Sequence, residues 1–599
     1  LDRYAANLTD EPANAKFGEL LAAALPSGVE QLLWVPPSVP YYKPEGAFGR
    51  TQHFSKTLLF SPLVSAPRAL SSLVSYECER RLLAAGRNTR QRYFGERSQK
   101  HGPLAFESKS VSAALGLVYP SVRLARLVKF APGESLDQLR SRVRNALRSD
   151  LEKLVARHGG GETKRGVRWY VLAPLLLDAP VNRESWFAEV GKSKQISQAR
   201  KNDTEQVKRW VNDQKLDLGR IPDGLLDYLV DLAIAGPAVC ALRSLQTVLP
   251  ADTPQHAVMA TACAFAFLGR MNRWESQRAI QVVCGKGKPW IALPQYAAQG
   301  NLQATFDEYF HLLHGQSGSQ DELLEAFVQA LGTGASTVVA QSHLPYRSGD
   351  TRKFDRSFHC HVAVSLGNQN ITDQKGISRV VNVRAAFNSP FWPFLLNSTS
   401  VGQEGLDFHW YCRRVVHWSL PSNPIDIEQR EGRVNRYKSL LVRQRLAKSI
   451  EPPPHVVHPQ DVWSALFTQA ASKRISGTDL EPLWYVHGES PKLERLVPAV
   501  GFSAEQCRLQ QMLRILSLYR LCFGQPRQEE LLASLLKHEY SFSDLREIKR
   551  ALIVELAPIL QVTRKPPPPI EVRLSESSSP APARVPPTKL DSRESPFAG

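Results

Sequence analysis

The stretch from Ala386 to Tyr437 decides the fold, and it reads AFNSPFWPFLLNSTSVGQEGLDFHWYCRRVVHWSLPSNPIDIEQREGRVNRY. Its first part is an apolar run, Phe391 to Leu396, followed by a turn of small residues that ends in the acid Asp407. Its second part is another apolar run, Val415 to Leu420, followed by a turn and a polar segment, residues 425–436. Short apolar runs bounded by turn residues are typical of buried strands. The stretch therefore predicts two strands of an α/β sheet, each followed by a polar segment.

The polar segment 425–436 carries two arginines and an amide at helical spacing. Gln429, Arg433 and Arg436 stand at positions i, i+4 and i+7, so a helix would present them on one face. Gly432 lies between them and would let a ligand approach the backbone closely. Guanidinium groups bind phosphate through paired hydrogen bonds and stay charged at any working pH. The pattern indicates a phosphate-binding stripe; the alternative is a basic surface helix behind a buried strand.

The two parts of this stretch resemble motifs V and VI of superfamily-2 helicases, and most closely those of the Swi/Snf-type ATPases. In those families a Glu-Gly turn leads to a strand and then to the pattern LPxNPxxxEQRxGRxxR. Every anchor of that pattern is present here: Leu420, Pro421, Asn423, Pro424, Glu428, Gln429, Arg430, Gly432, Arg433 and Arg436. Helicase-like proteins of bacterial anti-phage systems are similar too.

The resemblance implies a role in ATP binding for the second part. Arg433 and Arg436 would contact the γ-phosphate, with Gln429 assisting them and Gly432 lining the nucleotide site. An arginine in such a place stabilises the charge that spreads over the oxygens of a transferring phosphoryl group.

The resemblance also implies roles for the first part. Gly405 and Asp407 would lie near the nucleotide sugar or couple the ATP cleft to the nucleic acid. Thr399 and Ser400 would contact the nucleic-acid backbone. Asp407 is an acid where several Swi/Snf relatives carry an amide or another residue, so the resemblance defines its role least.

Hydrophobic patterning and the resemblance together predict an α/β fold: a RecA-like lobe with a parallel sheet, a large mainly helical insertion and a helical C-terminal domain. The expected parts are a linker and the end of a first lobe (1–50), the second RecA-like lobe (51–80 and 331–445), the insertion (81–330), a C-terminal accessory domain (446–561) and a disordered Pro- and Ser-rich tail (562–599). The expected strands are 56–61, 358–366, 391–396 and 415–420, and the expected helices include 5–25, 67–76, 135–157, 192–214, 223–249 with a break at Gly236-Pro237, 377–387, 504–523 and 528–538.

A superfamily-2 motor also needs a first lobe with a phosphate loop and an Asp-Glu pair. Gly285-Lys-Gly-Lys288 lacks the spacing of a phosphate loop, and Pro289 follows it. Asp307-Glu308 lies in an amphipathic helical pattern without a preceding buried strand. We therefore expect ATP and Mg²⁺ to be held mainly by a first lobe that is absent from this chain, and we expect the chain alone to hydrolyse no ATP at a useful rate.

Composition bounds the partners and the compartment. The 599 residues carry a net charge of +18, which favours a polyanionic partner, with DNA ahead of RNA. Other defence-system proteins are expected partners by analogy with anti-phage systems only. No apolar run of roughly 18 residues stands out, so no membrane span is expected. Eight cysteines without a CxxC motif favour reduced thiols in the cytoplasm.

Three alternatives limit this interpretation. His359-Cys360-His361 invites a metal site, but neighbours on a strand point to opposite faces and no second ligand cluster follows. A degenerate lobe could serve as a non-catalytic scaffold. A plain nucleic-acid-binding module could act through net charge alone.

Overall fold

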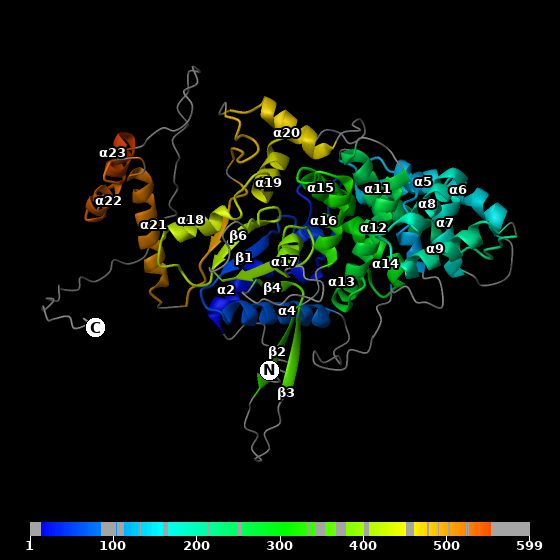
Figure 1. Cartoon of the computed structure of the whole chain (residues 1–599), viewed down its shortest axis with the longest axis horizontal. Coiled ribbons are helices and arrows are strands. Elements are labelled where there is room, and N and C mark those ends of the chain that lie inside the picture. Colours follow the sequence, from blue (N-terminus) through cyan, green and yellow to red (C-terminus); the bar gives the residue numbers. More distant parts are fainter. Residues whose placement is uncertain are drawn as a thin grey trace, which may run out of the picture. The chain divides into compact units, whose positions relative to one another are not determined.

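A five-stranded parallel sheet carries the two parts of the decisive stretch (Figure 1). The strands are β1 (Lys56–Phe60), β4 (Ala363–Leu366), β5 (Leu395–Ser398), β6 (Cys412–His417) and β7 (Glu494–Leu496), in the order β4-β5-β1-β6-β7. In this computed structural model the described residues are 14–85, 104, 113–131, 133–159, 166–213, 215–249, 254–332, 336–342, 354–366, 379–399, 406–450, 461–475, 478–488, 490–500, 503–522, 524, 526–538 and 540–552. The tail expected at 562–599 lies outside them.

The central strand β1 is buried along its whole length, so both of its faces contribute to hydrophobic cores. Leu58 and Phe60 belong to one cluster with α17 (Arg379–Phe387), and α18 (Ile425–Gly432) lies on the same face. Leu59 points to the opposite face, into a larger core shared with α4 (Ala66–Ala85). This alternation follows from the two-residue period of a strand.

The larger core continues without interruption into a region of packed helices. Its helices are α5 (Val122–Leu127), α6 (Leu136–His158), α7 (Gly166–Leu176), α8 (Pro180–Lys192), α9 (Gln198–Val211), α10 (Leu225–Ala235), α11 (Pro237–Val248), α12 (Pro254–Met271), α13 (Trp274–Cys284), α14 (Pro289–Gln299), α15 (Leu302–His314) and α16 (Gln320–Gly332). The α/β lobe and the large helical region agree with the fold class expected from the sequence. The domain boundaries remain a prediction, because one core spans the sheet and the helices.

Several predicted helices are confirmed by their caps. Ser135 begins α6 with a capping box that it forms with Gln138, as its position before the apolar pattern indicates. Gly236 and Pro237 separate α10 from α11 at the predicted break. The helix expected at 192–214 is wrong at its start, because α8 ends at Lys192 and α9 begins only at Gln198.

The pair α10–α11 is also the one described segment, Leu225–Val248, that is long and apolar enough to cross a membrane. Its most apolar window is 89% buried within the protein. Burial of this kind is typical of core helices, which can be as long and as apolar as a membrane-spanning helix.

The segment expected as a linker, residues 1–50, is packed in its described part. It contains α2 (Ala15–Ala24), a 3₁₀ turn (Val29–Gln31) and α3 (Gly46–Arg50). The Trp34 indole is fully buried and donates to the Gly300 carbonyl at 3.0 Å. A Cβ at Gly300 would lie 2.5 Å from the Trp34 ring, so only glycine lets the chain approach so closely.

The predicted strands are shifted in three places. β5 begins at Leu395 rather than Phe391, because Pro393 has no N–H to give to a sheet ladder. β6 runs from Cys412 to His417 rather than from Val415 to Leu420. The strand expected at 358–366 is interrupted after Cys360: β3 (Phe354–Cys360) pairs with β2 (Ser336–Ser342) as an antiparallel hairpin, and β4 joins the sheet.

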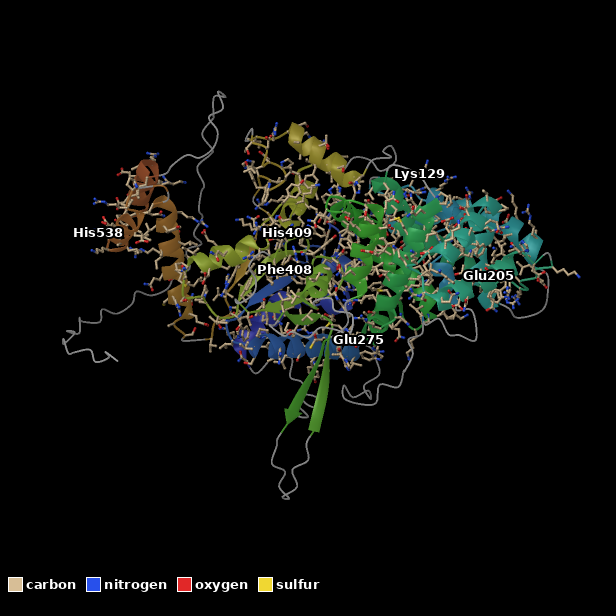
Figure 2. All side chains as sticks on the ribbon, viewed as in Figure 1. Lys129, Glu205, Glu275, Phe408, His409 and His538 are labelled. Atoms are coloured by element: carbon tan, nitrogen blue, oxygen red, sulfur yellow. The ribbon has the colours of Figure 1, made fainter. Side chains whose placement is uncertain are left out.

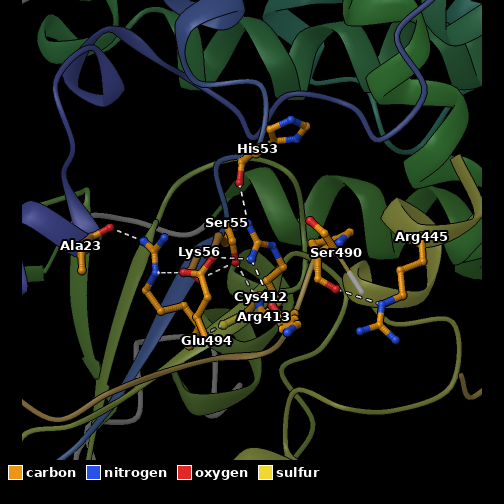
Figure 3. A network of polar contacts seen from close by, with 12 residues as sticks. Ala23, His53, Ser55, Lys56, Cys412, Arg413, Arg445, Ser490 and Glu494 are labelled. Carbon is orange, nitrogen blue, oxygen red and sulfur yellow. Dashed lines mark hydrogen bonds and ion pairs between the residues drawn. The ribbon is translucent and has the colours of Figure 1, made fainter. Parts of the chain in front are cut away.

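The segment 446–561 was expected to be helical, and β7 contradicts this in part because it pairs with β6. Glu494 of β7 forms ion pairs with both Arg413 and Arg414 of β6 (Figure 3). These pairs explain how β6 takes two arginines into a buried strand, and also how three residues without an apolar pattern become an edge strand. The helices of this segment are α19 (Leu440–Ser449, beginning before it), α20 (Val462–Ser472), α21 (Glu505–Cys522), α22 (Gln528–Leu536) and α23 (Phe542–Leu552).

Candidate phosphate-binding site

Helix α18 begins where the sequence signals it. The Asn423 side chain accepts a hydrogen bond from the backbone N–H of Ile425 at 3.0 Å. Asp426 and Glu428 in the first turn complement the partial positive charge of the helix N-terminus.

Two sides of α18 are occupied by protein. On the sheet side, the buried Arg430 guanidinium lies 5.2 Å from the centre of the Phe60 ring and 3.4 Å from His417 Nδ1. On a second side, Ile427 packs in a cluster with Met512 of α21. Glu428 forms an ion pair there with Arg520 of α21. Arg430, the first of the three arginines of this pattern, is therefore structural.

The third side carries Gln429, which is exposed. The prediction that one helix presents Gln429, Arg433 and Arg436 together is wrong in geometry, because α18 ends at Gly432. Arg433 is the C-terminal cap, and Arg436 lies beyond the turn. The Arg433 carbonyl accepts from the Phe408 N–H at 2.9 Å, so this carbonyl is used by a neighbouring segment instead of by a longer helix.

Backbone bonds join the two parts of the decisive stretch. Besides the bond between Phe408 and Arg433, the Leu440 N–H donates to the His409 carbonyl at 2.9 Å. The Asn388 side chain donates to the Asp407 carbonyl at 2.8 Å. Segment 406–411 therefore lies against the turn that follows α18, and Figure 2 labels Phe408 and His409 in this part of the lobe.

These bonds bring Asp407 and Arg436 together as an ion pair of 3.2 Å. The Arg436 Nε–H is not aligned as a hydrogen bond to the carboxylate. Both side chains are more than 30% exposed, at 39% for Arg436 and 32% for Asp407. The half-exposed Arg433 has no ion-pair partner among the residues that the structure describes. One guanidinium is thus unpaired and the other is held loosely beside the predicted acid.

The surroundings of the turn are strongly positive. Burial, together with the guanidiniums of Arg443, Arg436 and Arg384, lowers the pKa of His409 to about 3. His409 is therefore neutral across the physiological range. Arg443 is itself paired with Glu308, so an anion at the turn would be bound by the other arginines.

Arg443 of α19, which the sequence did not single out, anchors this turn. Its fully buried guanidinium donates to Glu308 of α15 at 2.7 Å, to the Lys438 carbonyl at 2.6 Å and to the Trp410 carbonyl. Glu308 also accepts from the backbone N–H and hydroxyl of Ser38, each at 2.8 Å. One buried ion pair therefore ties the turn, the approach to β6 and the helical region together. No spacing rule distinguishes Arg443 from its neighbours, so the sequence held no signal for it.

The other predicted residues are only partly placed. Thr399 is half-buried directly after β5. Ser400 and Gly405 lie outside the described residues. The Gly285–Lys288 segment connects two helices, α13 and α14. A phosphate loop joins a strand to a helix instead, so this position agrees with the rejection of the motif.

The donor set fits phosphate and does not supply a metal site. Guanidiniums match phosphate oxygens. Mg²⁺ takes oxygen ligands instead, and the nearby carboxylate, Asp407, is already paired with Arg436. Throughout the described ranges, no group of three or more His, Cys, Asp or Glu side chains could hold a metal ion.

Comparison with known proteins agrees with this geometry. The family model described as the helicase conserved C-terminal domain matches residues 372–438. The match supports a helicase-type C-terminal lobe that contains these residues. The match includes α17, β5, β6, α18 and the turn with Arg433 and Arg436, and it leaves out the helical region. No curated protein and no solved structure matches the chain.

Proposed function

We propose that this helicase-type lobe is the C-terminal half of an ATP-dependent motor that moves on nucleic acid, of the Swi/Snf type. The observation that carries the proposal is the pair of guanidiniums after α18: Arg433 without a partner among the described residues, and Arg436 beside Asp407. Both side chains are partly exposed, so an anion can reach them.

In this proposal Arg433 and Arg436 bind the γ-phosphate of ATP, and the exposed Gln429 assists. ATP supplies the phosphoryl group, and Mg²⁺ would be held by a first lobe with a phosphate loop and an Asp-Glu pair. The role of the present residues is to neutralise charge on the phosphate oxygens. Asp407 keeps Arg436 oriented until the phosphate competes for it.

Nucleic acid is the proposed track, with DNA ahead of RNA. The net charge of +18 supports a polyanionic partner. Thr399, at the end of β5, and Ser400, in the segment after it, are proposed to contact the backbone. All eight cysteines are free thiols, which supports the cytoplasm as the proposed compartment.

The test is nucleic-acid-stimulated ATP hydrolysis by this chain together with a lobe that carries a phosphate loop. We expect Arg433→Ala and Arg436→Ala each to lower kcat by about 10³-fold or more, the range measured for arginines that stabilise phosphoryl transfer. Arg209→Ala, an exposed arginine of α9, is the matched control and should leave kcat unchanged.

Two outcomes would overturn the proposal. Unchanged turnover in both arginine variants would show that the guanidiniums do not act on phosphate, and a non-catalytic scaffold would then be the better account. Useful turnover by the purified chain alone would contradict the need for a first lobe.

A further inference from the structure

Two exposed aromatic side chains lie directly beside the arginine turn, and the phosphate-binding role does not use them. Tyr437 follows Arg436 in the chain and is 43% exposed; Trp484 is 41% exposed. Their ring centres are 5.9 Å apart at an interplanar angle of 66°. The Tyr437 hydroxyl and the Trp484 indole N–H have no hydrogen-bond partner in the described part of the chain. Exposed aromatic rings beside arginines form a surface that a planar anionic ligand can contact.

The backbone holds these rings side by side. The N–H of Lys438 donates to the Leu483 carbonyl at 2.7 Å, which joins the turn to the segment that carries Trp484. The backbone N–H of Trp484 donates to the Leu480 carbonyl at 2.8 Å. The two rings therefore come from segments far apart in sequence but fixed to each other.

Lys438 adopts a backbone conformation that a lysine rarely takes. Its φ is +50°, in the left-handed region that costs a side chain with a Cβ about 1 kcal/mol or more. Three contacts hold it there: the bond to Leu483, the bond from Arg443 to its carbonyl, and a contact of 3.1 Å from its Nζ to His311 Nε2. His311 in turn pairs with Asp461. Strain maintained by buried contacts is typical of ligand sites.

The strained turn places the Lys438 side chain between a buried imidazole and an exposed ring. The Lys438 Nζ contacts the buried His311 and also lies 5.6 Å from the centre of the Tyr437 ring, which is exposed beside Trp484. Burial lowers the pKa of His311, and Lys438 and Arg443 lower it further against the opposing effect of Asp461. The neutral imidazole accepts from the ammonium through Nε2, so its Nδ1–H faces Asp461. The contacts of Lys438 with His311, and of His311 with Asp461, therefore fix the turn beneath the exposed Tyr437 ring.

We propose that Tyr437 and Trp484 form a stacking site for the base of the nucleotide whose phosphates bind Arg433 and Arg436. This inference rests on the proposed function. Charge complementarity identifies the occupant: aromatic faces accept a planar base, and the adjoining guanidiniums accept its phosphates. A base stacked on an aromatic side chain is held without sequence readout, because every base has a π-face.

The experiment compares two ligands that differ in the base. Affinities of ATP and of inorganic tripolyphosphate for the full chain are measured by ligand-observed NMR titration. In the wild type, ATP should bind about 5- to 100-fold more tightly than tripolyphosphate, the range of one or two stacking contacts. Tyr437→Ala and Trp484→Ala should each reduce this advantage several-fold and leave the affinity for tripolyphosphate unchanged.

Matched variants separate stacking from general damage. Tyr437→Phe keeps the ring and should keep the preference for ATP. Ile475→Ala removes an exposed apolar side chain (79% exposed) that is not aromatic, and it should change neither affinity. Arg433→Ala should weaken both ligands, because it removes a phosphate contact.

The outcomes distinguish this inference from the proposed function. If Tyr437→Ala and Trp484→Ala leave the preference for ATP unchanged while Arg433→Ala weakens both ligands, the stacking site is wrong and the phosphate site stands. If no arginine variant weakens either ligand, the proposed function fails first. A third arm uses a thymidine oligonucleotide and its abasic counterpart: loss of binding to the former only, with ATP unaffected, would assign the rings to bases of nucleic acid and overturn the assignment to the nucleotide.

Discussion

Arg436 and Arg443 are seven residues apart in sequence and lie in opposite environments. Arg436 is 39% exposed and makes one loose ion pair with Asp407. Arg443 is fully buried, and its guanidinium donates to one carboxylate and two carbonyls. The contrast separates a group that is free to bind a ligand from a group that fixes the turn presenting it. A guanidinium whose donors are all used inside the protein cannot serve a phosphate.

The largest expected effect on the free energy of unfolding is that of replacing the buried Arg443. Arg443→Met leaves the carboxylate of Glu308 buried without its cation, and breaking one side of a buried ion pair costs about 3–5 kcal/mol. Urea-induced unfolding followed by tryptophan fluorescence should show this loss. The double variant Arg443→Met with Glu308→Leu should recover most of it, because no unpaired charge remains. A loss below about 1 kcal/mol in the single variant would contradict the stabilising role of the buried pair between Arg443 and Glu308.

The next effect depends on pH and concerns His409, which lies between the two arginines. Its pKa of about 3 in the folded state is below the value of about 6.5 in the unfolded state. Between these values the unfolded state binds more protons, so stability falls as pH decreases from about 7 toward 3. At pH 5 this group should account for about 2 kcal/mol.

His409→Gln should make the unfolding free energy less dependent on pH between 7 and 5 by that amount. Other buried histidines also have lowered pKa values, so the comparison is between variant and wild type. His314→Gln, at an exposed position, should leave the slope unchanged. Equal slopes in the wild type and in His409→Gln would show that the imidazole is not held neutral.

A smaller effect is expected for the exposed pair. Asp407→Asn should reduce the free energy of unfolding by about 0–1 kcal/mol, since half-exposed ion pairs are screened by solvent. Unfolding in low and high salt measures it, and the difference from the wild type should shrink as salt is added. A loss that persists at high salt would show a structural role for Asp407.

The smallest effect on stability is expected for Arg433→Ala, within about ±0.5 kcal/mol, because its side chain makes no ion pair among the described residues. The same variant is expected to have the largest effect on turnover. Thermal unfolding and ATP hydrolysis of one preparation test both statements. A destabilisation comparable with that of Arg443→Met would remove the contrast on which the site depends.

The sequence alone led to the prediction of a phosphate-binding stretch. The spacing of Gln429, Arg433 and Arg436 indicated a phosphate-binding segment, and the matched family model agrees with the helicase-type lobe. Apolar runs located β1 and the neighbourhoods of β5 and β6. These features are local, because strand burial and cap residues act over a few neighbouring positions.

Only the tertiary structure decided how the arginines are presented. Their expected common helical face does not exist, because the Arg433 carbonyl pairs with Phe408 and α18 ends at Gly432. The roles of Arg443, Glu308 and Trp484 depend on partners more than a hundred residues away in sequence or in separate segments. No pattern within one segment encodes such contacts, because the partner that makes a charge buried or an aromatic ring available arrives only when the chain has folded.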